Sequence, residues 1–215
     1  MHKVINKSLV DQICSVLRER IIELNMEPGV RIDVQKLAEE FEVSETPVRV
    51  ALAKLTQEGF VKLLPRRGYF VIKLTKKDIK EIYDLRIMLE SYALDTAMEN
   101  MKPERLKEIY KNLEKLREIS DEKERERESL RIDQEFHREI INNCDNKRAQ
   151  KLFYQIYDFA RISLWMHKRI GEDINEHIAV IKALLQKNKK EAKRLLVQHL
   201  KNARKAILEA VDKSS

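Results

Sequence analysis

The sequence predicts a mainly α-helical protein with two parts, an N-terminal winged helix-turn-helix and a C-terminal all-α antiparallel helical bundle. Two observations indicate this division. Three of the four glycines and three of the four prolines fall in the first third of the chain, where they would form the turns of a compact module. Beyond that point, apolar residues recur at helical spacing through long segments without a strand pattern.

The length of 215 residues exceeds that of an average domain, so we expect two domains that each bury a core. A capping pattern formed by Thr75 and Asp78 opens the helical part of the chain. We therefore assign residues 1–74 to the winged module and residues 75–215 to the bundle.

Composition limits the class of protein. Apolar residues make up 43% of the chain, and no apolar run approaches the roughly 20 residues that span a bilayer, so we expect no membrane association. Cys14 and Cys144 are too few for a disulfide framework and the N-terminus has no signal core, which favours the cytoplasm. The net charge of +7 is spread along the chain, so it permits a nucleic-acid partner without locating the binding surface.

The first module is expected to contain three helices and a hairpin. Apolar periodicity over residues 9–24 predicts the first helix. Asp33 and Ser44 are the expected N-caps of the second and third helices. The run "FVKLLPRRGYFVIKL" is typical of two short strands joined by a turn. Helix, helix, short turn, helix and hairpin is the order of a winged helix-turn-helix, whose last helix can enter a major groove of DNA.

Residues that face outward at the start of the third helix are candidate DNA contacts. Arg49 can bond a guanine edge or a phosphate, and Ser44 and Thr46 can reach phosphates. The hairpin tip adds a second cationic point on a narrow projection. The candidates outside the helix are Arg66, Arg67 and Gly68. The alternative is a protein-interaction module with ordinary surface arginines.

The second module is expected to form six helices, at about 76–100, 103–119, 122–143, 147–170, 173–187 and 189–212. Four polar residues fall on the apolar faces of three of them: Asp133, His137, His177 and His199. A single inward histidine is usually a hydrogen-bonded core residue. Four such groups together favour a divalent cation, because a buried carboxylate needs compensation and neutral imidazoles are good ligands.

One carboxylate oxygen and three imidazole nitrogens suit Zn or Ni, and also Mn, Co or Fe. Such a site keeps open positions, so a metal-dependent hydrolase is an alternative. However, Glu135 and Glu139 point to other helix faces, and the site therefore lacks a general base. We expect a protein that is not an enzyme.

The stretch "PGVRIDVQKLAEEFEVSETPVRVALAKLTQEGFVKLLPRRGYFV" resembles the DNA-binding domain of GntR-family bacterial transcription regulators. The resemblance implies operator contacts by Ser44, Thr46 and Arg49, a phosphate contact by Arg31, and a wing tip at Gly68. Many members have arginine where this chain has Glu45. A glutamate there can accept a hydrogen bond from a cytosine amino group, so the operator is expected to differ from the commoner sites of the family.

The segments "DLRIMLE", "DQEFH" and "NEHIAVIKAL" resemble the FCD ligand-binding domain of the FadR-like subfamily. In metal-binding members, an aspartate and three histidines hold a divalent cation whose coordination a small carboxylate effector completes. The resemblance implies that the ligands are Asp133, His137, His177 and His199. It also implies that Arg86 binds the effector carboxylate, the alternative being a surface salt bridge with Asp84 or Glu90.

These observations together predict a ligand-responsive regulator, expected to repress a metabolic operon. It would act as a homodimer on a palindromic double-stranded DNA operator and respond to a small carboxylate effector. A regulator for which the metal ion is itself the signal is a further alternative.

Overall fold

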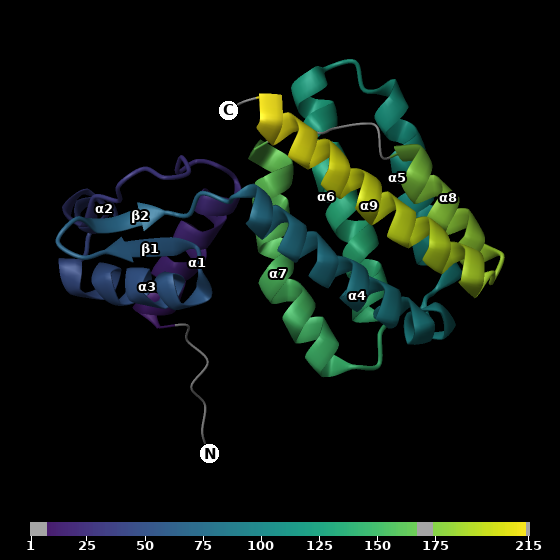
Figure 1. Cartoon of the computed structure of the whole chain (residues 1–215), viewed down its shortest axis with the longest axis horizontal. Coiled ribbons are helices and arrows are strands. Elements are labelled where there is room, and N and C mark those ends of the chain that lie inside the picture. Colours follow the sequence, from purple (N-terminus) through teal and green to yellow (C-terminus); the bar gives the residue numbers. More distant parts are fainter. Residues whose placement is uncertain (1–7, 167–173, 214–215) are drawn as a thin grey trace. The chain divides into compact units, whose positions relative to one another are not determined.

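The computed structural model describes residues 8–166 and 174–213. The chain forms two compact units, Met1–Thr75 and Lys76–Ser215 (Figure 1). Helices dominate both units and a single hairpin supplies the strands of the described ranges, so the predicted fold class is confirmed. Over these ranges, no helix is long and apolar enough to cross a membrane.

The first unit contains three helices and one hairpin, in the predicted order. The elements are α1 (Leu9–Ile22), α2 (Val34–Glu40), α3 (Glu45–Glu58), β1 (Val61–Leu64) and β2 (Gly68–Val71). Asp33 starts α2 by accepting a hydrogen bond from the backbone N–H of Lys36 at 3.1 Å. Gly59 ends α3 in the left-handed conformation, with φ of 90°. The first helix is shorter than its periodicity predicted, because Leu24 adopts a left-handed turn with φ of 57°.

The helices of the first unit pack around α3, which contacts α1, α2 and β1. The inward residues of α3 are Val48, Ala51, Leu52 and Leu55, all fully buried. Strand β1 pairs with one edge of β2, and residues 30–32 pair with the other edge. In that second pairing, Val71 donates to Val30 at 3.0 Å and Ile32 donates to Tyr69 at 2.8 Å. This pairing fixes Arg31 beside the hairpin, which forms the wing.

The second unit is a bundle of helices and no strand interrupts its described residues. The elements are α4 (Lys76–Asn100), α5 (Pro103–Lys115), η1 (Leu116–Glu118), α6 (Glu122–Asn142), α7 (Lys147–Met166), α8 (Ile174–Leu185) and α9 (Lys189–Lys213). The helix predicted over 103–119 is therefore an α-helix followed by one 3-10 turn. The predicted boundaries at 170 and 173 lie outside the described residues.

Helix α4 occupies a central position in the bundle, because it packs against α6, α7 and α9 (Figure 1). Helix α8 packs against α5 and α9. Neighbours on several sides bury more than one face of α4, including two charged residues, Arg86 and Glu90. The polar residues predicted to face inward lie in this same interior, among Phe136, Ile140, Tyr157, Ile181 and Leu196.

Candidate metal centre and DNA-reading surface

The start of α3 exposes four of the residues predicted to contact DNA. Ser44 is the N-cap, yet its side chain makes no capping hydrogen bond, so its hydroxyl is available to a ligand. Glu45, Thr46 and Arg49 are exposed. Arg49 and Glu45 form an ion pair one helical turn apart, with Nη2 and Oε2 separated by 2.6 Å. The two side chains therefore lie against each other on the exposed surface of α3.

The wing turn places two further arginines at the tip of the hairpin. Arg66 adopts a left-handed φ of 61° and Gly68 a φ of 96°, which together reverse the chain between β1 and β2. A Cβ atom on Gly68 would lie 3.5 Å from Nε of Arg31. That distance is an ordinary van der Waals contact, so glycine is favoured here by its left-handed φ and not by lack of space.

A groove of about 870 Å³ connects the wing with the start of α3. Its lining includes five of the predicted DNA contacts: Arg31, Glu45, Arg49, Arg66 and Gly68. The structure therefore brings these five residues together from three separate segments. Ser44, Thr46 and Arg67 do not line the groove.

The second unit brings the four predicted metal ligands together. Asp133 and His137 come from α6, His177 from α8 and His199 from α9. One ligand atom from each residue lies within 4.8 Å of the other three. Oδ1 of Asp133 is 3.4 Å from Nε2 of His137 and 3.4 Å from Nε2 of His177. The contact with His177 joins residues more than 40 positions apart in the sequence, counted from residue 133 to residue 177.

Burial defines the electrostatics of this cluster. The three imidazoles are almost fully buried, while the Asp133 side chain keeps 14% of its surface exposed. Burial by itself would raise the pKa of Asp133, but the adjacent imidazoles of His137 and His177 hold that pKa well below its usual range. Burial and the nearby His177 lower the pKa of His199 to about 3. The carboxylate is therefore ionised and His199 is neutral at physiological pH.

Three residues that were not predicted to contact the metal ligands lie against them in the structure. Glu90 lies 2.5 Å from Nδ1 of His137, and Glu176 lies 2.8 Å from Nδ1 of His199. The hydroxyl of Tyr157 donates to Oδ2 of Asp133 at 3.0 Å. Such outer partners orient metal ligands in proteins and select the tautomer of each histidine.

Arg86 lies beside this cluster and is buried, with 2% of its surface exposed. Its Nε donates to Oε1 of Glu90 at 2.9 Å. Its guanidinium lies about 5 Å from the ring centroids of Tyr83 and Tyr157. Within the described part of the chain, no acceptor reaches its Nη2. Arg86 does form a salt bridge with Glu90, but this pair is buried and does not lie at the surface as the alternative expected. Asp84 pairs instead with Arg204.

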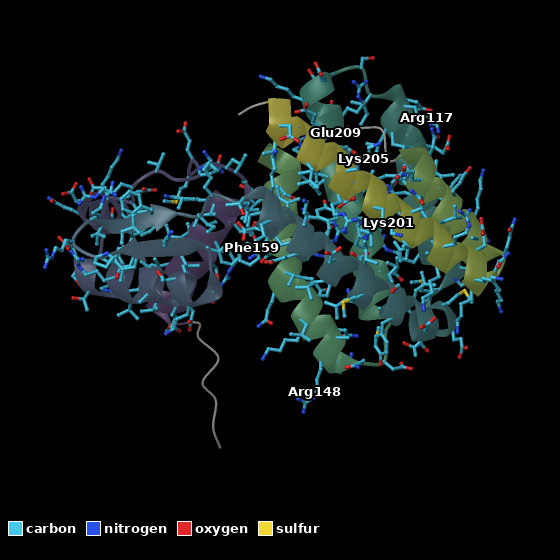
Figure 2. All side chains as sticks on the ribbon, viewed as in Figure 1. Arg117, Arg148, Phe159, Lys201, Lys205 and Glu209 are labelled. Atoms are coloured by element: carbon cyan, nitrogen blue, oxygen red, sulfur yellow. The ribbon has the colours of Figure 1, made fainter. Side chains whose placement is uncertain are left out.

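The outer faces of the same helices bear ordinary surface charges. Glu135 pairs with Arg105 and Arg131. On α9, Lys201, Lys205 and Glu209 are exposed (Figure 2), whereas His199 faces the interior. Glu135 therefore does not point at the four-residue cluster.

The residues present fit a divalent cation. Bonds of about 2.1 Å to a tetrahedral ion separate neighbouring ligand atoms by roughly 3.4 Å. The two separations measured from Oδ1 of Asp133 have this value. In addition, Nε2 of His137 is buried and has no hydrogen-bond partner among the described residues. A buried nitrogen without a partner is costly, and a cation would satisfy it.

Comparisons with known proteins identify both units. The family described as bacterial regulatory proteins, gntR family, matches residues 9–71, and the FCD domain matches residues 81–202. The chain belongs to the GntR family. The FCD match assigns this GntR regulator to the members with an FCD effector-binding domain. The protein is a DNA-binding transcriptional regulator and not an enzyme.

Relatives of this GntR regulator include the HTH-type transcriptional regulator YdhC of Bacillus subtilis, which is 30% identical over 87% of this chain and 86% of the relative. The gluconate operon transcriptional repressor of Bacillus subtilis is 31% identical over 86% of this chain and 77% of the relative.

Solved structures share the fold. A GntR regulator from Rhodococcus sp. RHA1 has a TM-score of 0.79 and 23% identity, and the match covers 94% of this chain and 98% of that one. A zinc-bound FCD domain of another regulator has a TM-score of 0.55 and 22% identity, over 65% of this chain and 97% of that one.

Proposed function

We propose that this GntR regulator is a repressor of a metabolic operon. In this proposal, its FCD domain holds a divalent cation through Asp133, His137, His177 and His199 and binds a small carboxylate effector. The observation that carries the proposal is the convergence of four ligand atoms within 4.8 Å in the interior of the bundle. Some relatives are named operon repressors, which supports the direction of regulation.

The chemistry of the donors supports a transition metal. Three neutral imidazoles and one carboxylate favour Zn or Ni over Mg or Ca, which prefer oxygen ligands. Mn, Co and Fe suit the same donors. When bound, the ion neutralises Asp133 and offers its remaining coordination positions to an oxygen ligand. The zinc-bound FCD domain of the other regulator supports this choice of metal by fold alone.

Arg86 supports an anionic effector. Its Nη2 is buried and unpaired among the described residues, and a guanidinium binds a carboxylate by strong charge-assisted hydrogen bonds. Gluconate, named in the operon of one relative, is itself a carboxylate. We infer that the effector joins the cation and Arg86 through one or two carboxylate groups.

The effector must rearrange the site in order to enter it. The cavity lined by Asp133 and His177 has a volume of about 10 Å³, roughly the space that holds one water molecule. A carboxylate of several heavy atoms would therefore displace side chains of α5, α6 or α8. A ligand that binds only the rearranged bundle has the differential affinity that regulation requires.

We propose that DNA binds across the groove between the wing and α3. Arg49 would contact base edges, Glu45 would set its direction or accept from a cytosine, and Ser44, Thr46 and Arg31 would bind phosphates. Arg66, Arg67 and Gly68 would meet the backbone or the minor groove. Since a regulator acts where its DNA lies, we propose a cytoplasmic location.

A homodimer would place two such surfaces on a palindromic operator. Three exposed apolar residues of α4 support it: Leu85, Met88 and Tyr92, which share one helix face. Leu152 on α7 is also exposed, and α7 packs against α4. If this face joins two copies, native mass spectrometry should show a dimer that Met88→Glu converts to a monomer.

The decisive experiment combines composition with DNA binding. Elemental analysis and native mass spectrometry of the purified protein should report one transition-metal ion per chain. Operator affinity is then measured for metal-loaded and metal-stripped protein, with and without gluconate and other small carboxylates. Release of DNA by a carboxylate only when metal is present supports the proposal.

Two other outcomes have different meanings. Loss and recovery of DNA binding as Zn is removed and restored, without any carboxylate, favours the alternative in which the ion is the signal. If the metal site is fully occupied but neither metal removal nor added carboxylate changes DNA binding, the ion is purely structural and the effector proposal is refuted.

A further inference from the structure

A closed ring of contacts joins the proposed effector residue to the proposed metal ligands. Arg86 donates to Glu90 at 2.9 Å, and the other oxygen of Glu90 lies 2.5 Å from Nδ1 of His137. His137 faces Asp133 at 3.4 Å. Asp133 accepts from Tyr157 at 3.0 Å, and the Tyr157 ring faces the Arg86 guanidinium at 5.0 Å. Helices α4, α6 and α7 each contribute to this ring.

Glu90 is the member of the ring whose carboxylate contacts both Arg86 and a proposed metal-ligand histidine. It is fully buried, and each of its two carboxylate oxygens has a different partner. Arginine is always a donor, so the oxygen facing Arg86 must accept. Arg86 carries a permanent positive charge, and its buried ion pair with Glu90 requires a carboxylate as the partner. The second oxygen of that carboxylate can only accept.

This arrangement determines the position of a proton on His137. An acceptor at Nδ1 requires a hydrogen there, so the neutral ring has no hydrogen on Nε2. The lone pair of Nε2 then points at the cluster where the four ligand atoms meet. We propose that Glu90 is a positioning residue that fixes His137 in its metal-binding tautomer and links that ring to the guanidinium of Arg86. The link to metal binding rests on the proposed function, whereas the tautomer of His137 can be measured in metal-free protein.

The substitution Glu90→Gln tests the position of the hydrogen on His137, because glutamine has nearly the same shape as glutamate but can donate as well as accept. Arg86 still needs an acceptor, so the amide oxygen should face Arg86 and the amide nitrogen should face His137. Nδ1 must then accept, and the hydrogen moves to Nε2, where it blocks the ligand position. We expect a loss of metal affinity on the order of ten- to hundredfold, the range typical of outer-shell substitutions.

The tautomer can be observed directly in metal-free protein. Nitrogen-15 NMR of the histidine rings at pH 8 distinguishes a hydrogen on Nδ1 from one on Nε2. We expect Nδ1–H for His137 in the wild type and Nε2–H in Glu90→Gln. His199 provides an internal comparison, because its Nδ1 faces Glu176 at 2.8 Å and should not change.

A matched control lies on the same helix. Glu81 is exposed on α4 and pairs only weakly with Lys77, at 3.7 Å. Glu81→Gln removes the same charge and should change neither the His137 tautomer nor Zn affinity, measured by competition with a chelator.

The inference and the proposed function fail in different ways. If wild-type His137 has its hydrogen on Nε2 in metal-free protein, or if Glu90→Gln leaves the tautomer and Zn affinity unchanged, Glu90 has no positioning role. If the tautomers behave as expected but wild-type protein binds no Zn, the metal proposal fails and the role of Glu90 on His137 stands. The wild-type measurement decides the first point even if the variant does not fold.

Discussion

The hydroxyl of Tyr157 donates a hydrogen bond to Oδ2 of Asp133 at 3.0 Å. This contact leaves Oδ1, the other oxygen, facing His137 and His177. A single tyrosine on α7 thus determines which carboxylate oxygen is presented to the proposed cation.

Tyr157→Phe removes this hydroxyl and keeps the ring that faces Arg86. We expect Zn affinity to fall by roughly tenfold, because Asp133 loses the bond that orients it. Chelator competition measures the change. Tyr154→Phe is the matched control on the same helix, since its hydroxyl bonds Asn142 at the surface; equal effects of the two substitutions would contradict the prediction.

Removal of the metal should destabilise the FCD domain. A ligand at one hundred times its dissociation constant stabilises a folded protein by about 2.7 kcal/mol. We therefore expect thermal unfolding to occur at a lower temperature after chelation and to recover with added Zn. His177→Ala should abolish this difference, whereas Lys201→Ala, on the exposed face of α9 (Figure 2), should retain it. A chelation effect that persists in His177→Ala would exclude His177 as a ligand.

Removal of Arg49 and removal of Glu45, its ion-pair partner, should change DNA affinity in opposite directions. Arg49→Ala should weaken operator binding by about 1–3 kcal/mol, the usual loss for a base-reading arginine. Glu45→Ala should strengthen binding to unrelated DNA, because it removes a negative charge from the surface that meets phosphates. Fluorescence anisotropy at several salt concentrations measures both. Arg148→Ala removes the same charge from an exposed site on α7 (Figure 2) and should leave affinity unchanged.

Arg86→Lys tests the effector site while keeping the buried positive charge. An ammonium cannot make the planar two-point contact of a guanidinium. We expect the carboxylate concentration that releases DNA to rise by roughly tenfold or more, since a hydrogen bond to a charged group contributes about 1.5–3 kcal/mol. Zn stoichiometry should not change. An unaltered carboxylate response would remove Arg86 from the effector site.

Acid should destabilise the metal-free protein through His199. Its pKa is lowered to about 3, whereas an unfolded histidine titrates near about 6.5. The unfolded chain thus binds the proton more readily, so this residue lowers stability as pH falls from about 6.5 toward 3. At pH 5 the loss is on the order of 2 kcal/mol. Denaturant unfolding should show a weaker pH dependence for His199→Gln between pH 7 and 5, and parallel curves would contradict the assignment.

The periodicity of the sequence was sufficient to predict the fold class and most helix boundaries. Asp133 and His137 could be assigned to one face because they lie one turn apart on a single helix. The approach of His177 and His199 depended on packing between α6, α8 and α9, which no local pattern encodes. Helical spacing placed both histidines on apolar faces and so suggested a shared cation site, and the resemblance to the FCD family implied the same four ligands.

The contacts of Glu90 and Glu176 with His137 and His199 could not be predicted, because a sequence pattern places glutamate outside by default. Glu90 was considered only as a surface partner of Arg86. Arg86 was assigned correctly to the first bundle helix, but its burial arises from the three helices that surround α4. Which side of α4 packs against α6, α7 and α9 is determined by the tertiary structure and not by the local sequence. The charged pair of Arg86 and Glu90, one turn apart on this helix, is the local signal that could have suggested their burial.

The unpaired Nη2 of Arg86 has a consequence for selectivity. In a dry interior, a charged nitrogen without an acceptor favours molecules that carry negative charge over neutral molecules of the same size. An alcohol or aldehyde with the same carbon skeleton as the acid would leave that nitrogen unsatisfied. A regulator with such a site would therefore report how far a metabolite has been oxidised, and not merely how much of its carbon skeleton is present.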